Sequence, residues 1–500
     1  MKKILILVMG VMTTQLYSQF QVGDDIIGKT DENSGWSVAL AKNLNGQPQM
    51  LAVGGPSVTK GGIESGTVRV YKLVNNNWVQ KGSELIGSNI DDQFGYSLSM
   101  PDINTLAIGI PGSDLKSVDC GEVKIYKWDG SDWIFNSSIF GSDSFDNFGF
   151  AISMPSKNVI AVSSPNNHGT GPEEKWTQMG QVKIFKLNQT AWEQIGNNLN
   201  GSNQGDKFGY CIDMPDSITI GISSINNNSG GAGNGQVKVY QYNYDSLNWI
   251  QKGADLNGGE NSTWDQSGWS ISMADKSTIA IGAPDNDGNC NNCGHIRIYS
   301  WDARFAEWVQ KGEDIDGEFN NNKFGYSVSM NSSNLLAASS INYTGTDGDG
   351  CGYVRAFKFD STLNNWVQFG NNIEGKAGER SGASVSFENN LIAIGAPLHS
   401  VNLKLLGKAR VYSIEKLMGY ESVQQKIYIL NNSLSNGQNI KIQGLVENSN
   451  FIIIDNMGRV IQSGFILKDN PEIQLMNFVS GIYYLIIDGQ YLYKAEIVVE

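Results

Sequence analysis

The sequence contains few of the residues from which catalytic sites and disulfide scaffolds are built. Its 500 residues include only 3 His and 5 Cys. The histidines, His168, His295 and His399, are scattered, and no G-x-S-x-G, H-E-x-x-H or phosphate-loop motif is present. Five Cys are few for a secreted domain held together by disulfides. These shortages argue against an enzyme, and we expect a non-catalytic protein.

Long apolar runs are equally scarce. Residues 1–19 contain two lysines, the apolar run ILILVMGVM and a polar end at Ser18. This is the pattern of a signal peptide cleaved near Ser18–Phe20, and it is too short for a membrane helix. No other stretch is long and apolar enough to span a bilayer. We therefore predict a protein that is secreted or held on the outer cell surface, with no transmembrane helix.

Positive charge is also in short supply. Lys and Arg number 36 against 50 Asp and Glu, which gives a net charge of −14 and a pI of about 4.8. Such a balance argues against binding to nucleic acid or to anionic membrane surfaces. We expect a soluble monomer.

The chain is organised by a repeat that opens on a glycine. The repeat glycines are Gly35, Gly95, Gly149, Gly209, Gly268, Gly325 and Gly382, with spacings of 60, 54, 60, 59, 57 and 57 residues. Each unit has four short apolar runs between turns, as in Gly268–Met273, Thr278–Pro284, Ile296–Trp301 and Glu307–Gly317. A four-stranded unit of this length cannot cover both of its faces, so it must stack on its neighbours.

The first run of each repeat favours a ring of blades over a linear array. Residues Tyr96–Met100 (YSLSM) are typical, with large side chains at positions one, three and five after the Gly and small ones at positions two and four. Successive strand residues face opposite sides, so a bulky face can pack against a small face where blades crowd around an axis. We predict an all-β fold with a seven-bladed β-propeller at residues 20–416.

A Trp recurs in the fourth run of six repeats, and we interpret this set as core anchors: Trp78, Trp133, Trp192, Trp249, Trp308 and Trp366. The seventh repeat lacks this run. Residues Phe20–Gly28, which follow the signal peptide, have the same pattern with Phe20 in place of Trp. We predict that this N-terminal strand completes the last blade, which would remove the free strand edges and join the two ends of the ring.

A short polar residue stands three positions before each repeat glycine: Glu32, Asp92, Asp146, Asp206, Asp265, Asn322 and Glu379. Carboxylates and amides at such positions commonly accept hydrogen bonds from the backbone N–H groups that follow. We interpret these residues as turn caps.

The F-G and G-A-P elements resemble the FG-GAP repeats of the integrin α-subunit propeller, which is also seven-bladed. The strongest G-A-P copies are Ile281–Pro284 and Ile394–Pro397, with looser ones at Gly109–Pro111 and Gly54–Pro56. In that family a calcium loop of the D-x-D-x-D-G kind separates the FG strand from the GAP strand. Tight turns such as Pro101–Thr105 fill that place here, so the family's calcium sites are not expected.

Acidic pieces occur instead after the G-A-P position, at Asp285 and Asp287 and at Asp347 and Asp349. Alternating carboxylates ahead of a Gly turn suit a hard cation such as Ca²⁺. Each piece lacks the distal bidentate acid of a complete calcium loop. Solvated turns are therefore the favoured interpretation, and Ca²⁺ sites are the alternative.

Three further positions are candidates outside the regular pattern. Trp176 and Trp264 stand apart from the recurring Trp, and we consider them as surface contacts for a ligand, because variable loops on a rigid scaffold usually carry binding. Burial of either side chain against a loop is the alternative. Cys290 and Cys293 are close enough in sequence for a disulfide, and two free thiols fit equally well; one C-x-x-C is weak evidence for a metal site.

The repeat pattern stops after the seventh unit. Residues 417–426 form a predicted linker, and residues 427–500 hold about seven short alternating strands, which predict a small β-sandwich. Within it, Ile454–Ile461, Ser480–Ile487 and Tyr493–Val499 resemble the C-terminal sorting domain of the Bacteroidetes type IX secretion system. The resemblance implies that this segment routes the protein across the outer membrane through the type IX machinery. An ordinary small β domain is the alternative.

These features together predict an exported, non-catalytic propeller that binds protein or glycan ligands in the manner of an adhesin. A polysaccharide-active enzyme working near the ring axis would need two carboxylates about 5–9 Å apart. The first strands offer one acid, Asp213, for which hydrogen bonding to its neighbours is the favoured role. A structural cell-surface component with no discrete ligand is a further alternative.

Overall fold

The computed structural model describes residues 17–42, 49–57, 59–60, 63–168, 178–259 and 264–416, and, towards the C-terminus, residues 428–429, 433–434, 439–443, 449–455, 459–467, 472–475, 478–488 and 492–499. These residues form strands and turns and include no helix, so the predicted all-β class is confirmed. None of them forms a helix that could cross a membrane. The chain divides into two compact units, one of Gln19–Glu415 and one that contains Lys416–Glu500.

The first unit contains seven sheets of four or five strands in its described residues. The first three are β3 (Ser37–Leu40), β4 (Met50–Gly55), β7 (Thr67–Val74), β8 (Asn77–Gln80) with β9 (Leu85–Ile86); β10 (Ser97–Asp102), β11 (Thr105–Ile110), β12 (Glu122–Trp128), β13 (Trp133–Phe140); and β14 (Ile152–Ser156), β15 (Val159–Ser164), β16 (Gln181–Asn188), β17 (Ala191–Gln194) with β18 (Leu199–Asn200).

The next three sheets are β19 (Phe208–Asp216), β20 (Thr219–Ser224), β21 (Gln236–Asn243), β22 (Asn248–Gln251) with β23 (Leu256–Asn257); β24 (Ser270–Asp275), β25 (Thr278–Ala283), β26 (His295–Asp302), β27 (Glu307–Gln310) with β28 (Ile315–Asp316); and β29 (Phe324–Ser332), β30 (Leu335–Ser340), β31 (Tyr353–Asp360), β32 (Asn365–Glu374). The last sheet is β33 (Ser384–Glu388), β34 (Leu391–Ala396), β37 (Lys408–Lys416) and β1 (Tyr17–Gln21), with β2 (Ile26–Ile27) also beside β37. Two short hairpins, β5 (Thr59–Lys60) with β6 (Ile63–Glu64) and β35 (Ser400–Val401) with β36 (Lys404–Leu405), extend from loops.

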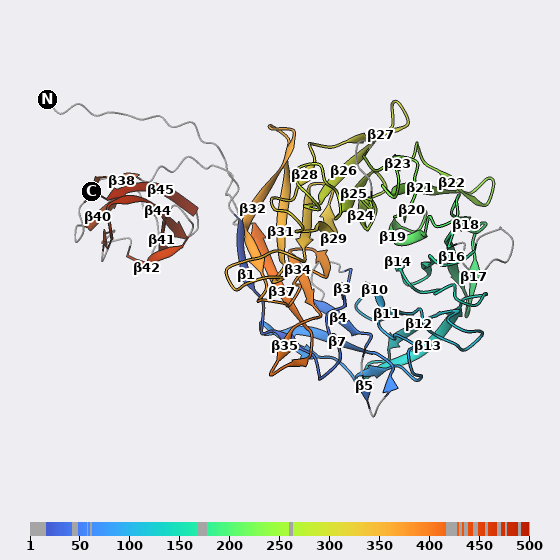
Figure 1. Ribbon diagram of the computed structural model, residues 1–500. Coiled ribbons are helices and arrows are strands. Elements are labelled where there is room, and N and C mark those ends of the chain that lie inside the picture. Colours follow the sequence, from blue (N-terminus) through green and yellow to red (C-terminus); the bar gives the residue numbers. More distant parts are fainter. Residues whose placement is uncertain are drawn as a thin grey trace. The chain divides into compact units, whose positions relative to one another are not determined.

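The seven sheets have a propeller-like arrangement (Figure 1). The first strand of each sheet lies towards the centre and the fourth towards the periphery. Each second strand is buried along its whole length or nearly so, because it is covered by the sheets on both sides. This explains why the second run of each repeat is continuously apolar, while the first and third runs alternate.

The first strands are joined to one another by side-chain hydrogen bonds. The backbone N–H at position five of one strand donates to the side-chain oxygen at position four of the strand before it. These bonds are Met154 to Ser99 (3.1 Å), Met214 to Ser153 (2.9 Å), Met273 to Asp213 (2.7 Å), Met330 to Ser272 (2.9 Å), Phe387 to Ser329 (2.9 Å) and Leu40 to Ser386 (3.1 Å). The remaining junction is bridged by Ser37, whose hydroxyl donates to the carbonyl of Gly95 at 2.7 Å.

The small residues of the first strand therefore carry hydrogen bonds as well as allowing close packing. Asp213 takes the place of a Ser in this set, and its second oxygen accepts a bond from the Ser153 hydroxyl at 3.2 Å. The expectation that Asp213 bonds to its neighbours is confirmed. The bond from Leu40 to Ser386 links the first sheet to the last across 346 residues of sequence.

The N-terminal strand belongs to the last sheet, as predicted. Strands β1 and β2 pair with β37, and Val22 N–H donates to the carbonyl of Val411 at 2.8 Å. The prediction that Phe20 replaces the recurring Trp is wrong by one residue. Gln19 occupies that position: its carboxamide lies against Gly370 and accepts the N–H of Asn371 at 2.8 Å, while Phe20 is 42% exposed.

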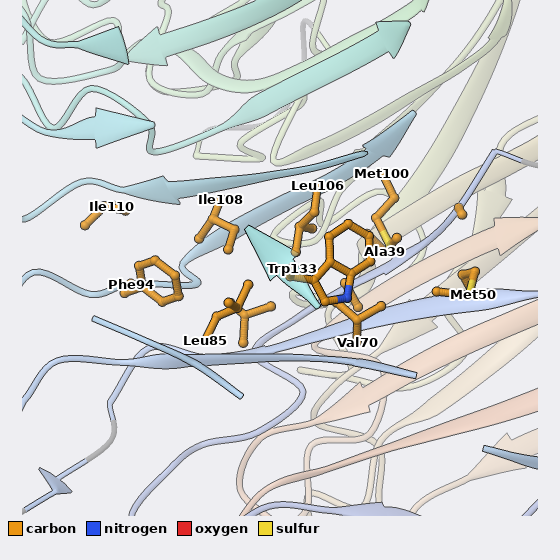
Figure 2. Close-up of a cluster of buried hydrophobic side chains, with 13 residues drawn as sticks. Ala39, Met50, Val70, Leu85, Phe94, Met100, Leu106, Ile108, Ile110 and Trp133 are labelled. Atoms are coloured by element: carbon orange, nitrogen blue, oxygen red, sulfur yellow. The ribbon is translucent and has the colours of Figure 1, made fainter. Parts of the chain in front are cut away.

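Apolar clusters fill the spaces between neighbouring sheets. Figure 2 shows one of them, in which Met50 and Val70 of the first sheet meet Leu106, Ile108 and Trp133 of the second. All of these side chains are at most 4% exposed. Because each sheet shares its apolar faces with the sheets beside it, no sheet has a complete core of its own.

The recurring Trp side chains anchor these junctions. Each indole N–H donates to the preceding sheet at 2.8–3.0 Å: Trp78 to Val22, Trp133 to Lys81, Trp249 to Ile195, Trp308 to Lys252 and Trp366 to Lys311 through backbone carbonyls, and Trp192 to the hydroxyl of Ser137. Half of the set is buried and half is partly exposed. The interpretation of these residues as core anchors is confirmed, and the core lies between sheets.

The described residues of the second unit form two sheets. One consists of β38 (Tyr428–Ile429), β40 (Asn439–Gln443) and β43 (Glu472–Gln474), and the other of β39 (Ser433–Leu434), β45 (Leu492–Val499), β44 (Gly481–Asp488), β41 (Ser449–Asp455) and β42 (Val460–Ile466). Its buried residues include Phe451, Ile453, Ile473, Leu475 and Leu485. This unit therefore has an apolar core of its own.

We expect Trp308→Ala to lower the free energy of unfolding by about 3 kcal/mol, because it removes a large side chain from the junction of two sheets together with its hydrogen bond to Lys252. Denaturant titration of the purified protein measures this change. The matched control is Glu307→Ala, which alters the exposed neighbour on the same strand. An unfolding midpoint for Trp308→Ala equal to that of the control would refute the role of this Trp.

Candidate functional site

Of the two tryptophans predicted as ligand contacts, the structure describes one, Trp264. Trp176 lies outside the described residues. Trp264 is 60% exposed, and its backbone has a left-handed φ of 67°. Its indole lies over Gly233, where a Cβ would overlap the ring. It is thus a surface residue supported by a neighbouring loop.

The acidic residues considered for Ca²⁺ are used in local contacts. Asp285 pairs with the ammonium of Lys323. Asp287 accepts the N–H of Asn292 at 2.6 Å, and Asp349 accepts the hydroxyl of Thr344 at 2.9 Å. None of Asp285, Asp287, Asp347 and Asp349 belongs to a group of three or more metal-ligand side chains in the described part of the chain. The favoured interpretation as turns agrees with these contacts.

One group of such side chains does come together, although no motif in the sequence marks it. His295, Asp314 and Asp316 place ligand atoms within 4.8 Å of one another. Arg297 already occupies the cationic position beside them, with three hydrogen bonds of 2.9–3.0 Å to the carboxylate of Asp314. The group is therefore an ion pair with a buried imidazole beside it, and burial lowers the pKa of His295 to about 4.

The disulfide considered between Cys290 and Cys293 is not formed, and both are free thiols. The turn that joins them directs the Sγ of Cys293 to the carbonyl of Cys290 at 2.8 Å, and the N–H of Cys293 donates to the same oxygen at 3.3 Å. Burial and the adjacent Cys293 thiol raise the pKa of Cys290 to about 11. A thiol that stays protonated at neutral pH is a poor nucleophile for disulfide formation.

The structure brings together a different set of residues at the centre of the ring. The residue that follows the repeat glycine is aromatic in six repeats: Trp36, Tyr96, Phe150, Tyr210, Trp269 and Tyr326. Each ring contacts the next, with centroids 5.0–5.6 Å apart and planes tilted by 44–49°. We call these six residues the aromatic collar. In the seventh repeat the same position is Ala383.

The repeat glycine positions the collar. At all seven glycines φ lies between 86° and 97°, in the region that residues with a side chain rarely adopt. A Cβ on Gly35 would also lie 2.2 Å from the carbonyl oxygen of Lys408. After this turn the N–H of the collar residue donates to the carbonyl three residues earlier, as from Trp36 to Asn33 (3.1 Å). Each repeat therefore presents its next side chain in the same way.

The three collar tyrosines have their hydroxyl groups in a shared, partly buried environment. Burial raises the pKa of Tyr96, Tyr210 and Tyr326 above the ordinary value. The charge of a Tyr326 phenolate would raise the pKa of both Tyr96 and Tyr210 further, so the hydroxyls interact across the collar as well as along it. At neutral pH all three remain protonated and can donate hydrogen bonds.

Polar residues stand next to the collar in every repeat. The residue two positions before the repeat glycine is Asn33, Gln93, Asn147, Lys207, Gln266, Lys323 and Arg380 in turn. All seven are left-handed, with φ of 50–60°. They offer amides and cations and no carboxylate. Arg380 lies near enough to Tyr326 that its charge acts to lower the pKa of that hydroxyl. The collar therefore combines aromatic faces with hydrogen-bond donors.

The loops that carry these residues are held by the carboxylates predicted as turn caps, but through different bonds. Asp206 and Glu379 accept the N–H of the residue three positions earlier, each at 3.0 Å, rather than one that follows. Asp146, Asp206 and Asp265 also accept from the carboxamides of Asn167, Asn227 and Asn286, respectively, at 2.8–3.1 Å. Each of these three acids thus ties the loop before the collar to the loop after the second strand.

The aromatic pattern was visible in the sequence, since Gly-Tyr, Gly-Phe or Gly-Trp recurs in six repeats. From the sequence alone, the residue after the repeat glycine is one of three bulky packing positions in the first run. Strand alternation shows which residues share a face. It does not show that position one meets its counterparts from the neighbouring repeats, because those residues are 54–60 positions apart along the chain.

The chain matches no family model and no curated protein. Among solved structures it is similar to Sqt1 of Saccharomyces cerevisiae, with 11% identity and a TM-score of 0.43 over 79% of this chain and 99% of that one. It is also similar to a functionally unknown protein from Desulfotomaculum acetoxidans, with 11% identity and a TM-score of 0.40 over 71% of this chain and 90% of that one. Similarity at this level assigns no function.

We expect the stability of Asp146→Asn, relative to that of the natural protein, to increase as pH rises. Burial, with a contribution from Asp143, raises the pKa of Asp146 from 3.8 to about 6 despite its bonds to Asn167. A folded-state pKa above the unfolded one means that Asp146 contributes its full stability below about pH 4 and loses it as pH rises through about 6. The Asn side chain has no such loss.

The free energy of unfolding of Asp146→Asn, relative to the natural protein, should therefore rise between about pH 4 and 6, by up to about 3 kcal/mol. Denaturant titrations at pH 4 and pH 7 measure the difference. Asn322 occupies the equivalent position in the sixth repeat, so an amide fits there. A difference that stays constant over this pH range would show that Asp146 does not titrate as described.

Proposed function

We propose that the chain is an exported, seven-bladed β-propeller that binds a glycan through the aromatic collar. The observation that carries this proposal is the continuous contact of six aromatic rings at the centre of the ring of sheets. The seven sheets, and the bonds that link each first strand to the next and the last to the first, support the count of seven blades.

The chemistry of the collar suits a sugar better than an apolar ligand. Binding sites for small ligands combine aromatic surfaces with a few placed polar groups. Tyrosine supplies an apolar face and a hydroxyl in one side chain. The neutral hydroxyls of Tyr96, Tyr210 and Tyr326 and the amides beside them can donate to sugar oxygens, and the faces of the rings can cover the C–H surface of a pyranose. These groups bind and orient, so we propose a non-catalytic role.

The proposal of export rests on the two ends of the sequence. The apolar run in residues 1–19 supports a signal peptide, and the motifs in residues 427–500 support a type IX sorting domain. The second unit has two sheets and its own buried core, which supports a small sandwich that is a separate module. Together these features support a surface or secreted location for a propeller joined to its sorting domain by residues 417–426.

We expect Trp36→Ala to weaken glycan binding at least about tenfold, or about 1.4 kcal/mol, because Trp36 is 40% exposed and presents the most accessible face of the collar. A glycan array followed by calorimetry on the best binder gives the comparison. The matched control is Trp264→Ala, an exposed Trp outside the collar, which should bind like the natural protein. Equal binding by Trp36→Ala would contradict the collar, and loss in Trp264→Ala instead would return the site to the outer loops.

We expect a chain stopped after Lys416 to remain in the periplasm of the native host, while the full chain reaches the surface or the medium. The reason is that the truncated chain keeps all strands of the first unit and lacks only the proposed sorting domain. Cell fractionation locates the two proteins, and resistance to mild proteolysis shows that the truncated one is folded. Delivery of both to the same place would overturn the sorting role.

A further inference from the structure

The aromatic collar is interrupted at one place. In the described chain the ring contacts run from Trp36 through to Tyr326 and do not continue to Ala383, which has only a methyl group. On the other side of Ala383 around the ring of sheets stands Trp36, since β33 and β3 are neighbours linked through Ser386 and Leu40. Trp36 is exposed, whereas the other five collar residues are half-buried. The exposure of Trp36 is explained by the absence of an aromatic side chain at Ala383.

At Ala383 no aromatic ring occupies the position that a collar ring occupies in the other six repeats. Each of the other six positions is filled by a single aromatic side chain in contact with its neighbours at 5.0–5.6 Å. Ala383 itself is only partly buried, so no other side chain fully covers it. A guest at this place would have Trp36 on one side and Tyr326 on the other. A six-membered sugar ring is about as large as the aromatic ring that each of the other six positions holds.

A cation stands beside the interruption. Arg380 is exposed, and the N–H of Ala383 donates to its carbonyl at 3.2 Å. Arg380 takes part in none of the ion pairs found in the described residues, whereas Lys323 of the neighbouring repeat is paired with Asp285. The adjacent carboxylate, Glu379, is buried and is engaged by Lys408 at 2.9 Å and His399 at 2.8 Å. The guanidinium of Arg380 is therefore available to an anion.

We propose that the interruption of the collar at Ala383 is a subsite for one acidic sugar residue, whose ring lies against Trp36 and whose anionic group is bound by Arg380. This inference rests on the proposed function of the collar in glycan binding and specifies the class of sugar. A guanidinium forms paired hydrogen bonds with a planar carboxylate or with a sulfate, so either group supplies the required chemistry.

The experiment uses the full chain and three trisaccharides: a trimer of galacturonic acid, a trimer of sulfated galactose and a trimer of galactose. Titration calorimetry at low salt measures the affinity for each. We expect at least one acidic trimer to bind about tenfold or more tightly than the neutral trimer. The better acidic trimer identifies the anionic group as carboxylate or sulfate.

Three variants locate the subsite. Arg380→Gln should remove the preference for the acidic trimer and leave weak binding of both. Ala383→Trp should abolish binding, because it completes the collar; the sequence Ser-Gly-Trp already occurs at Ser34–Trp36 and Ser267–Trp269, so Ser381–Ala383 can accept it. Arg304→Gln removes a cation from an exposed hairpin and is the control for net charge, with no expected change.

The outcomes separate this inference from the proposed function. If the acidic and neutral trimers bind equally and Arg380→Gln changes neither, the acidic subsite is wrong and glycan binding by the collar stands. If Ala383→Trp binds like the natural protein while Trp36→Ala does not, the ligand lies elsewhere on the collar. If none of the trimers binds the natural protein and the array is also blank, both the subsite and the proposed function are overturned.

Discussion

The free edge of the innermost strand is the constraint on which the rest of the structure depends. In every four-stranded sheet the first strand has a hydrogen-bonded partner on one side only, which leaves backbone N–H groups facing the neighbouring sheet. An unsatisfied buried N–H group costs roughly 1–3 kcal/mol. Six junctions meet this need with a side-chain oxygen at position four, five times from Ser and once from Asp213.

This solution also sets the separation of the inner strands. A Ser hydroxyl reaches the next backbone only when the two strands lie close, so an apolar residue at position four would lose the bond. The close approach has a consequence at position one, where the side chains of neighbouring repeats are brought to 5.0–5.6 Å. The collar thus follows from the same geometry that satisfies the strand edges.

The sequence was sufficient to predict those features that repeat within one unit. Strand alternation, the recurring Trp and the missing seventh run predicted the all-β class, the anchors at the sheet junctions and the pairing of the N-terminal strand. Features that depend on contacts between repeats were harder. Gln19 rather than Phe20 stands at the Trp position, because an amide can fill the space against Gly370 and no apolar signal marks it.

Local turn geometry explains two further differences between prediction and structure. Cys290 and Cys293 have the spacing of a disulfide, but the turn directs the Cys293 thiol to a carbonyl. The acids before the repeat glycines have the composition of turn caps, but three of them, Asp146, Asp206 and Asp265, tie two loops together through Asn side chains 21 residues away. In both cases the residue types indicate a polar contact. The partner of each contact depends on how the surrounding segments fold, which the sequence alone does not show.

The junction where the N-terminal segment meets the last sheet is stabilised by charge as well as by strand pairing. Lys408 of the last sheet is 2% exposed, and its ammonium contacts Asp25 of the N-terminal segment at 3.1 Å and Glu379 at 2.9 Å. A buried ammonium is tolerated only when carboxylates compensate for its lost hydration. Asp25 therefore gives the N-terminal segment a specific electrostatic role in closing the last sheet, and Glu84, Asp255 and Asp314 form comparable ion pairs with third-strand cations in three other sheets.

The break in the collar lies in this same sector of the ring. Ala383 belongs to the last repeat and Trp36 to the first, so a ligand between Trp36 and Tyr326 would contact the sheets on both sides of the closure. Such a ligand binds only when the last sheet is closed onto the first, and by mass action it must stabilise the closed ring in proportion to its affinity. Under this proposal, the position where the collar is interrupted is also the position where ligand binding would be thermodynamically coupled to closure of the ring, whereas the six aromatic collar positions obtain their packing from neighbouring side chains.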